Sequence, residues 1–380
     1  MRTWHVITGE YPPQPGGVSD YVYLLSGALA AAQDEVHIWC PSYEKARPDL
    51  PGVTVHDELG RFAPSDLRNM SRQLDRFPKP RRLLVQWVPH AFGYKSLNIA
   101  ICLWLWNRAR RGDSVDVMVH EPYLPFKRKA WRQNAAAWVH RLMTVILLRG
   151  AHHVWLSIPG WRAYLEPYAP SRPLGFDWLP VPSSVPVRDD AAAAGSIHRQ
   201  FASDGLLVGH FGTYGGPIAP MLHQILPACL RAAPDVSVLL MGGGSQRFRD
   251  DFVRQFSDWQ GRVHAAGYLD QSALSNHLAA CDVLVQPYPD GVSSRRTTVM
   301  AALAHGRPTV TTSGALTEPL WKSSGGIALA PAGDTEGFVR SLMRLLEDPA
   351  ERTRMGKAAR ELYRSQFDIR HIVDLLHEKI

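Results

Sequence analysis

Short apolar runs rich in β-branched residues alternate along this chain with longer stretches of helix-forming residues. In the first half, such runs predict strands near residues 4–8, 35–40, 53–56, 83–88, 115–119 and 153–156. In the second half, they predict strands near residues 206–211, 236–241, 263–266, 283–286, 309–312 and 326–329. Strands that alternate with helices are typical of parallel βαβ units. The pattern therefore predicts an α/β fold with two doubly wound parallel sheets.

The length of the chain, 380 residues, indicates two domains, because a single hydrophobic core rarely grows to that size. We expect an N-terminal domain over residues 1–180, a linker over 181–200 and a C-terminal domain over 201–360. The linker lies in a stretch rich in proline, serine and alanine. Residues 361–380 have a helical pattern, and we expect a helix that is able to cross back to the first domain. The expected ligand site is the cleft between the domains.

Composition narrows the classes of function. The chain is 45% hydrophobic and 20% charged, and no apolar run reaches the roughly 18 residues that a membrane span needs. The N-terminus lacks a small-residue cleavage site, so we expect a cytoplasmic protein. Four widely spaced cysteines without a CxxC pair favour reduced core residues over disulfides or a zinc site. We expect no metal and no cofactor.

The net charge of +7 indicates anionic partners. Basic residues gather beside tryptophan-containing segments at Arg108, Arg110 and Arg111, and again at Lys127, Arg128, Lys129 and Arg132. Such neighbours suit peripheral contact with an anionic membrane. The alternative is a pair of amphipathic helices that pack on a sheet with their cationic faces in water. Nucleic acid is not an expected partner, because no nucleic-acid-binding motif appears.

The segment from Cys281 to Thr312 predicts a strand, a loop rich in serine and arginine, a helix over 297–305 and a second strand. The loop residues Ser293 to Arg296 thus precede a helix N-terminus, which offers unpaired N–H groups and a positive dipole end. Two hydroxyls and two guanidinium groups add further donors. A phosphate or diphosphate fits this pattern. The alternative is that Ser293 caps the helix and that the arginines form a solvated face.

Glycines follow several other predicted strands, at Gly16 and Gly17, at 212–215 and at 242–244, where the backbone can approach a ligand closely. The first of these loops lacks GxGxxG, which disfavours a nicotinamide enzyme, and no GxxxxGK[ST] loop is present. Motifs of hydrolases, GxSxG and HExxH, are absent too.

His120 and Glu121 end a predicted strand, so both side chains should emerge at the carboxyl edge of the first sheet. A histidine at that position can hydrogen-bond a substrate, although a lone histidine is also often a structural hydrogen-bonding group. His90, at the end of another predicted strand, is a second and weaker candidate.

With these residues in view, the chain resembles the retaining glycosyltransferases of family 4, which have the GT-B fold of two Rossmann-like domains facing across a cleft. The resemblance covers nearly the whole chain. Its segments are GEYPPQPGGVSDYVYLLSGAL, VHEPYLP, GGGS, GYLDQSALSNHLAACDVLVQPY and AALAHGRPTVTT. VHEPYLP is similar to the His-containing strand end of mannosyltransferases that act on phosphoinositide lipids.

The resemblance implies roles for the candidate residues. His120 is the catalytic candidate, which contacts the transferred sugar. The residues assigned to the nucleotide sugar donor are Gly16, Gly17, Gly212, Thr213, Tyr214, Gly243, Tyr268, Ser293, Ser294, Arg295, Arg296 and Thr297. Among them, Ser293 to Thr297 hold the diphosphate, while Gly243 and Tyr268 lie by the base. The acceptor side is assigned to Glu10, Asp20, His90 and Glu121.

The chain departs from the family pattern. Members usually have two glutamates separated by seven residues after the last donor strand. Alignment on AHGRP places Ser293 and Ala301 there, whereas alignment on Asp290 gives Thr298 for the second position. The usual arginine and lysine after the first strand of the second domain are also missing, since residues 209–222 contain neither. We expect Arg295 and Arg296 to replace them, because guanidinium groups can neutralise a diphosphate leaving group.

The predicted function is metal-independent transfer of a sugar, with retention of anomeric configuration, from a nucleotide diphosphate donor to a glycan, lipid or small-molecule acceptor. Two alternatives stay open. One is a GT-B nucleotide-sugar epimerase, and the other is a catalytically weak protein that binds sugar nucleotides or anionic lipids.

Overall fold

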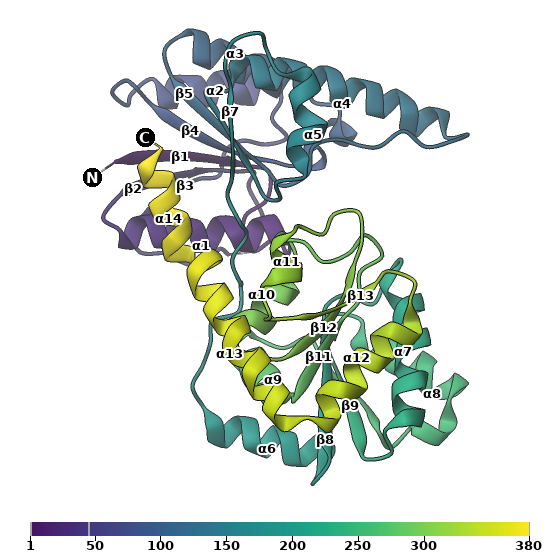
Figure 1. Ribbon diagram of the computed structural model, residues 1–380. Coiled ribbons are helices and arrows are strands. Elements are labelled where there is room, and N and C mark those ends of the chain that lie inside the picture. Colours follow the sequence, from purple (N-terminus) through teal and green to yellow (C-terminus); the bar gives the residue numbers. More distant parts are fainter. Residues whose placement is uncertain (1, 45, 380) are drawn as a thin grey trace. The chain divides into compact units, whose positions relative to one another are not determined.

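The computed structural model describes residues 2–44 and 46–379, which form two compact units (Figure 1). The first unit holds the residues up to 180 together with those from 369 onward. The second unit holds residues 181–368. Each unit is built on a parallel sheet of its own, so the predicted α/β class with two sheets is confirmed.

The first sheet has seven parallel strands in the order β3-β2-β1-β4-β5-β6-β7. Its strands are β1 (Thr3–Thr8), β2 (Glu35–Trp39), β3 (Val53–His56), β4 (Arg82–Trp87), β5 (Ser114–Val119), β6 (His153–Leu156) and β7 (Gly175–Trp178). Its helices are α1 (Gly17–Ala31), α2 (Pro64–Leu74), α3 (Ile99–Arg110), α4 (Trp131–Gly150), α5 (Trp161–Leu165) and α14 (Ile369–Glu378). Short 3-10 turns are η1 (Pro89–Phe92), η2 (Tyr94–Ser96) and η3 (Glu166–Tyr168).

Strand β7 is not among the strands that the sequence predicts, and it lies just before the predicted linker. Gly175 to Trp178 pair with His153 to Leu156 at the edge of the sheet. The strand is short and only partly buried, so it has neither the apolar run nor the strict alternation by which a strand is recognised.

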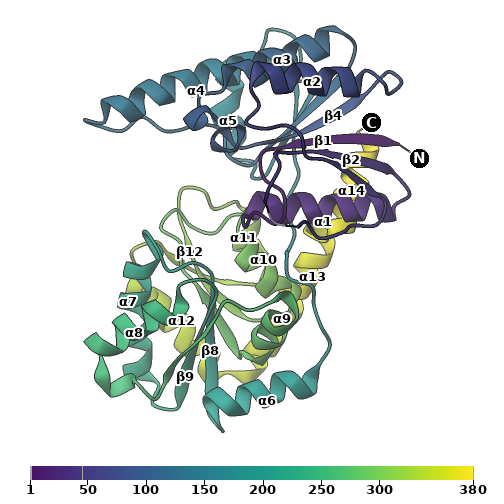
Figure 2. The same cartoon turned by 180° about the vertical axis from the view of Figure 1, so that it is seen from behind.

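Helix α14 packs beside α1 in the first unit, as both ribbon views show (Figures 1 and 2). His377 Nε2 lies 2.6 Å from Asp34 Oδ2, and Arg2 donates to the carbonyl of His377 at 3.2 Å. The predicted C-terminal helix over 361–380 is thus two helices, because α13 (Pro349–Gln366) ends before Phe367 and α14 begins at Ile369.

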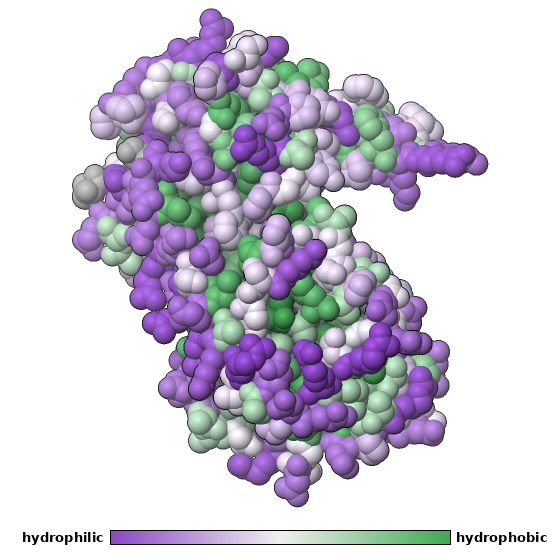
Figure 3. Space-filling view, viewed as in Figure 1, coloured by the Kyte–Doolittle hydropathy of each residue, from purple (hydrophilic) through white to green (hydrophobic). Residues whose placement is uncertain are grey.

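The N-terminal end of α4 and the loop before it project from the first unit (Figure 1). Figure 3 shows hydrophobic and hydrophilic side chains next to one another on this projection. Trp131 and Trp138 on α4 are 74% and 67% exposed. The expected basic cluster on α3 needs a correction, because Arg108 is only 1% exposed and its Nε lies 2.5 Å from Asp113 Oδ2. Arg110 and Arg111 remain exposed.

The second sheet has six parallel strands in the order β10-β9-β8-β11-β12-β13. Its strands are β8 (Leu206–Phe211), β9 (Val236–Met241), β10 (Val263–Gly267), β11 (Val283–Gln286), β12 (Thr309–Ser313) and β13 (Ala328–Pro331). Its helices are α6 (Ala191–Ala202), α7 (Ile218–Ala232), α8 (Ser245–Gln255), α9 (Gln271–Ala280), α10 (Thr297–Ala304), α11 (Leu320–Ser323), α12 (Thr335–Glu347) and α13, with the 3-10 turn η4 (Ser257–Trp259). Helix α6 begins inside the segment 181–200 that was predicted as a linker.

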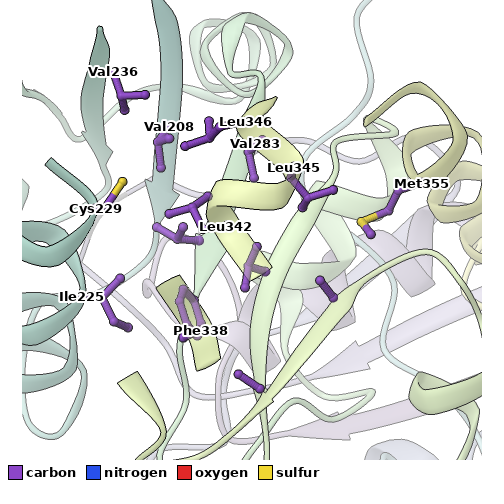
Figure 4. Packing of buried hydrophobic residues seen from close by; sticks show 14 residues of the cluster. Val208, Ile225, Cys229, Val236, Val283, Phe338, Leu342, Leu345, Leu346 and Met355 are labelled. Carbon is purple, nitrogen blue, oxygen red and sulfur yellow. The ribbon is translucent and has the colours of Figure 1, made fainter. Parts of the chain in front are cut away.

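The strands of the second sheet alternate between two apolar cores, as expected for a sheet covered on both faces. Val208, Val283 and Val285 pack with residues of α7 and α12, including Ile225 and Phe338 (Figure 4). Their neighbours in sequence, such as Leu207 and Leu284, pack on the other face with residues of α6 and α9. Within the described residues, all four cysteines are buried and free, and no helix is long and apolar enough to cross a membrane.

Strand order places a switch point in each sheet. Strand β1 lies between β2 and β4, and β8 lies between β9 and β11, so the chain moves outward in both directions from β1 and from β8. Loops that leave neighbouring strands on opposite sides of such a point diverge and leave room for a ligand at the carboxyl edge. The loops after β1, β4, β8 and β11 contain many of the candidate residues.

The first domain should be less stable in mild acid. Burial lowers the pKa of His5 and of His120 from 6.5 to about 3, so both stay neutral when folded but take up protons in the unfolded chain below about pH 6.5. As the pH is lowered further, the free energy of unfolding then falls by up to about 1.4 kcal/mol per pH unit for each histidine. Asp116, whose pKa burial raises to about 6, gives a smaller opposite effect.

These three groups alone lower the free energy of unfolding of this domain by about 2 kcal/mol between pH 7.5 and pH 5.5. His56, whose pKa burial lowers to about 4, adds to this fall. Urea unfolding followed by tryptophan fluorescence at both values measures this difference. Equal free energies at the two pH values would show that these histidines are not held neutral.

Candidate active site

The loop between β11 and α10 is held by a buried carboxylate. Ser293 and Ser294 are fully buried, and Glu318 is nearly so. The Ser294 N–H and hydroxyl both donate to Glu318 Oε1, at 2.9 and 2.5 Å, and Trp321 Nε1 donates to Oε2 at 2.6 Å. The assignment of Ser294 to the donor thus needs qualification, since its donors already have an acceptor within the chain. Its structural role is to fix the loop.

The two arginines of the loop share one carboxylate. Arg295 Nη2 lies 3.1 Å from Asp290 Oδ2, and Arg296 Nη2 contacts Oδ1 of the same residue. The Arg296 guanidinium also lies over the Tyr288 ring, 4.4 Å from its centre. Both arginines are only partly exposed, so they are not the freely solvated face of the alternative interpretation.

Two donor groups at this place have no acceptor. The hydroxyl of Ser293 and the Nε of Arg296 are buried, and neither has a hydrogen-bond partner in the part of the chain that the structure describes. A buried donor without a partner costs free energy of folding, so these two donors call for an explanation. Both adjoin the N-terminus of α10, where Thr297 is the first helical residue and the helix dipole favours an anion. The arrangement can hold a phosphate.

The loop after β8 combines exposed and inward-facing residues. Gly212 is half-buried and Thr213 is exposed. Tyr214, in contrast, donates its hydroxyl to the carbonyls of His210 and Met241, at 3.3 and 3.1 Å, and packs on Phe248. The structure thus gives the Tyr214 hydroxyl partners within the domain, and its assignment to the donor stays a prediction.

His210 is a candidate that sequence reasoning missed. Its Nδ1 lies 2.8 Å from the carbonyl of Val285, and its Nε2 is buried without a partner in the described chain. Burial lowers the pKa of His210 to about 4, so the ring is neutral and Nε2 is left as an acceptor. A Cβ atom on Gly212 would lie 3.5 Å from this nitrogen. The available signal was a histidine one residue before the end of a strand that a glycine follows.

The loop after β9 meets the loop after β8. Gly242 has a φ of +108°, and a Cβ atom there would lie 2.3 Å from the carbonyl oxygen of Gly212. No other residue fits this contact. Gly243 is exposed with open space in front of it, and Tyr268 is 88% exposed. Both residues are therefore accessible to a ligand, as we expect of residues that lie beside a nucleotide base.

In the first domain, His120 is buried just after β5, 8% exposed. Its Nε2 lies 2.9 Å from Gln86 Oε1 on β4, and its carbonyl accepts from Trp161 Nε1 at 3.1 Å. The ring also meets Tyr21 edge-on at 5.0 Å. Because burial lowers its pKa to about 3, His120 is neutral near pH 7 and acts as a hydrogen-bonding group and not as an acid.

Several of the acceptor-side candidates come together beside β1. Glu10 lies 3.7 Å from His90, which is in η1 and exposed, and a Cβ atom on Gly16 would lie 2.8 Å from the Glu10 carboxylate. Burial, with help from the charge of Glu121, raises the pKa of Glu10, while His90 lowers it. Gly17 faces open space.

Asp20 is exposed in the first turn of α1, apart from these contacts. Over residues 2–44 and 46–379, no three His, Cys, Asp or Glu side chains gather in a way that could hold a metal ion.

Comparison with known proteins relates the second domain to a known family. Residues 206–348, which contain the loop between β11 and α10, match the family model of glycosyl transferases group 1. The match accompanies two parallel, doubly wound sheets. The chain has the GT-B fold, and residues 206–348 resemble glycosyl transferases group 1.

Curated relatives of this GT-B protein include lipid glycosyltransferases. A GDP-mannose-dependent monoacylated alpha-(1-6)-phosphatidylinositol monomannoside mannosyltransferase of Corynebacterium glutamicum is 28% identical over 37% of each chain. A phosphatidyl-myo-inositol mannosyltransferase of Mycobacterium leprae is 23% identical over 92% of this chain and 89% of its own. The chain spans 34–43% of the length of the first relatives it matches.

Solved structures share the fold. Anabaena HepE in complex with UDP-glucose superposes with a TM-score of 0.68 at 15% identity, covering 100% of this chain and 99% of its own.

Neither position expected for the second glutamate of the family that the chain resembles holds a carboxylate. Ala301 is buried in the core on one face of α10. Thr298 Oγ1 lies 2.6 Å from the Tyr288 hydroxyl. Asp290 provides a carboxylate in this loop, and it forms ion pairs with both arginines. His210 Nε2, near Gly212 and Thr298, is a buried acceptor beside this loop.

Proposed function

We propose that this protein transfers a sugar from a nucleotide diphosphate donor to an acceptor, with retention of anomeric configuration. The observation that supports this most strongly is the pair of buried donors without partners, Ser293 Oγ and Arg296 Nε, at the N-terminus of α10. Both donors lie at the switch point of the second sheet. The residues of this sheet match the family model of glycosyl transferases group 1. The names of the relatives, which specify a nucleotide sugar or a sugar transfer, point the same way.

The chemistry follows from where charge develops. The bond between the anomeric carbon and the diphosphate oxygen breaks, and the electron pair stays on the diphosphate. The positive charge of Arg295 and Arg296 and the dipole of α10 stabilise that oxygen in the transition state. The acceptor oxygen forms the new bond on the same face of the sugar, and its proton passes to a donor phosphate oxygen. No protein base is required.

His120 would act in the first domain as a neutral hydrogen-bonding partner of the transferred sugar. Its Nε2 contact with Gln86 fixes the ring, and burial keeps it uncharged. A neutral ring can bind a hydroxyl that becomes polarised as positive charge grows on the sugar, without competing for the proton of the acceptor.

We propose a lipid as the acceptor, in glycolipid biosynthesis at the cytoplasmic face of a membrane. Two observations favour it. The relatives named above carry phosphatidylinositol derivatives in their names. The projecting end of α4 and its loop also expose aromatic side chains beside cations, with the Arg132 guanidinium 5.3 Å from the centre of the Trp131 ring. Exposed aromatic and basic side chains together are typical of surfaces that lie on anionic bilayers.

The protein should therefore bind anionic vesicles through this α4 surface. Lys127, Arg128 and Lys129 are exposed, and each charge near the bilayer contributes on the order of 1 kcal/mol. We expect co-sedimentation with anionic liposomes at low salt, weakened by salt and by the triple substitution of these residues with glutamine. Trp131→Ala should weaken binding as well, whereas Arg231→Gln, which removes an exposed charge of the second domain, should not.

Equal binding of the wild-type protein to neutral and anionic vesicles at low salt would remove this support for a lipid acceptor. A soluble glycan or small molecule would then be the better proposal.

A two-step assay separates transferase, epimerase and binding protein. First, thermal shifts are measured with UDP, GDP and ADP, because a ligand at 100 times its Kd stabilises by about 2.7 kcal/mol. The matching nucleotide sugars are then incubated with the pure protein and excess EDTA. Released nucleoside diphosphate with free or transferred sugar supports a metal-independent transferase. Interconversion of nucleotide sugars would indicate an epimerase, and binding without turnover would indicate a binding protein.

A further inference from the structure

A second concentration of positive charge lies at the opposite edge of the second sheet. A pocket of about 320 Å³ is bordered by α13, by the turn between α10 and β12, and by the residue before β11. Its charged lining residues are Asp282, Arg307, Arg352, Lys357 and Arg360. We refer to it as the basic pocket.

The charges of the basic pocket are not balanced within the chain. Four cations face one carboxylate. Asp282 is itself engaged elsewhere, since its Oδ2 accepts from the Leu207 N–H at 2.8 Å and lies 3.0 Å from His198 Nε2. No ion pair joins any of the four cations to a carboxylate among the residues that the structure describes. Burial, with the charge of Arg360 nearby, lowers the pKa of Arg307. Arg307 and Arg352 are partly buried, whereas Lys357 and Arg360 are exposed. Four cations gathered in this way favour an anion.

Backbone carbonyls hold three of the cations in place. Arg307 Nη1 donates to the carbonyls of Ala279 and Cys281 at 3.0 and 3.2 Å. Arg352 Nη1 donates to Leu345 and Leu346 at 2.8 and 2.7 Å, and Arg360 Nη2 donates to His305 at 3.4 Å. Each guanidinium group has five N–H donors, so most of its donors remain for a ligand. The side chains are therefore oriented in advance.

Close backbone packing brings α13 to the pocket. A Cβ atom on Gly356 would lie 2.5 Å from the carbonyl oxygen of Gly306, so only glycine lets the helix approach the turn after α10 this closely. Lys357 and Arg360 follow on the same helix and reach the pocket beside Arg307. The position of the cations thus depends on the fold and not on a flexible loop.

The basic pocket is separate from the proposed diphosphate loop, Ser293 to Arg296. Asp282 precedes β11 and Arg307 precedes β12, so the pocket lies at the amino edge of the parallel sheet. Ser293 to Arg296 follow β11 at the carboxyl edge. The pocket and the loop are therefore separated by the length of β11, and a strand rises about 3.3 Å per residue.

We propose that the basic pocket binds a small phosphorylated molecule of the sugar phosphate class, at a site distinct from that of the nucleotide donor. Planar guanidinium groups match phosphate oxygens, and a volume of about 320 Å³ accommodates a phosphate with an attached sugar ring. A purely structural role, in which the arginines only cap helix ends, does not account for Lys357, for which no hydrogen bond to the chain is seen in the described residues.

Calorimetry with the full-length protein tests this inference, with inorganic phosphate and a hexose 6-phosphate as probes at low ionic strength. We expect saturable binding of the hexose phosphate. Lys357→Gln and Arg360→Gln should each raise its Kd at least about fivefold, because each removes a charge-assisted contact. Lys357→Gln is the cleaner variant, since it removes no hydrogen bond seen in the structure. Arg231→Gln, a matched loss of one exposed charge in the same domain, should change the Kd by less than about twofold.

Binding must also be independent of the diphosphate loop, so Arg296→Ala should leave the Kd of the hexose phosphate unchanged. The inference is overturned if no saturable binding occurs, if all three glutamine variants weaken it equally, or if Arg296→Ala abolishes it. Weakening by Lys357→Gln and Arg360→Gln alone supports the basic pocket, whatever the enzymatic activity of the protein proves to be.

Discussion

His120→Ala should lower the turnover of the nucleotide sugar by about tenfold or more while changing the affinity for the nucleotide by less than about threefold. The reason is that His120 belongs to the first domain, whereas the diphosphate candidates belong to the second. Its neutral imidazole would contact the sugar and contribute mostly in the transition state. Initial rates with a saturating donor, together with nucleotide affinity from calorimetry, measure the two quantities.

Because His120 is buried, alanine leaves a cavity, so the thermal midpoint of the variant needs to be compared with that of the wild type. His120→Asn is the second variant, since it is smaller than histidine but keeps a hydrogen-bonding group. We expect it to retain more turnover than alanine does. Unchanged turnover of a folded His120→Ala protein with an authentic acceptor would return His120 to a structural role.

Arg295→Ala, Arg296→Ala or both should weaken binding of the nucleoside diphosphate by about ten- to a hundredfold and leave binding of the nucleoside nearly unchanged. Charge-assisted hydrogen bonds of roughly 1.5–3 kcal/mol act only on the phosphates. Arg296 is the stronger candidate of the two, because it is the N-cap residue of α10 and so lies directly at the helix N-terminus. Calorimetric titrations of diphosphate and nucleoside on the same protein sample provide the comparison.

Asp290 supplies a control for these variants. It pairs with both arginines, so Asp290→Asn keeps the guanidinium groups while it removes the negative charge that competes with the diphosphate. Its diphosphate affinity should be equal to that of the wild type or higher. Wild-type diphosphate affinity in both single alanine variants and in the double variant would show that the loop is not the phosphate site.

The strands were largely predictable, because their signal is local. Val236 to Met241 are a continuous apolar run with no competing interpretation, and the structure has this strand at the same residues. Gly175 to Trp178 have no such run and become a strand only through pairing with β6. The sequence did not predict helix α6 within the linker, for a related reason. The first residues of α6 are small, and its apolar positions contact α9 and β9, which are distant in sequence.

The loops that contain the site were predictable, but the partners of their side chains were not. Ser293 to Arg296 precede a helix in both sequence and structure. That Glu318 holds Ser294 could not be inferred, because the two lie 24 residues apart and meet only in the folded loop. Likewise, Arg108 appears in the sequence as one more surface cation, and its burial against Asp113 depends on the rotation of α3 about its axis.

A crystal structure of the protein with the nucleoside diphosphate that gives the largest thermal shift would test the central claim most directly. The account predicts the diphosphate at the N-terminus of α10, with Arg296 and the Ser293 hydroxyl within hydrogen-bond distance of its oxygens. Nucleotide in the basic pocket, or at any place that leaves Ser293 and Arg296 without contact to phosphate, would contradict it.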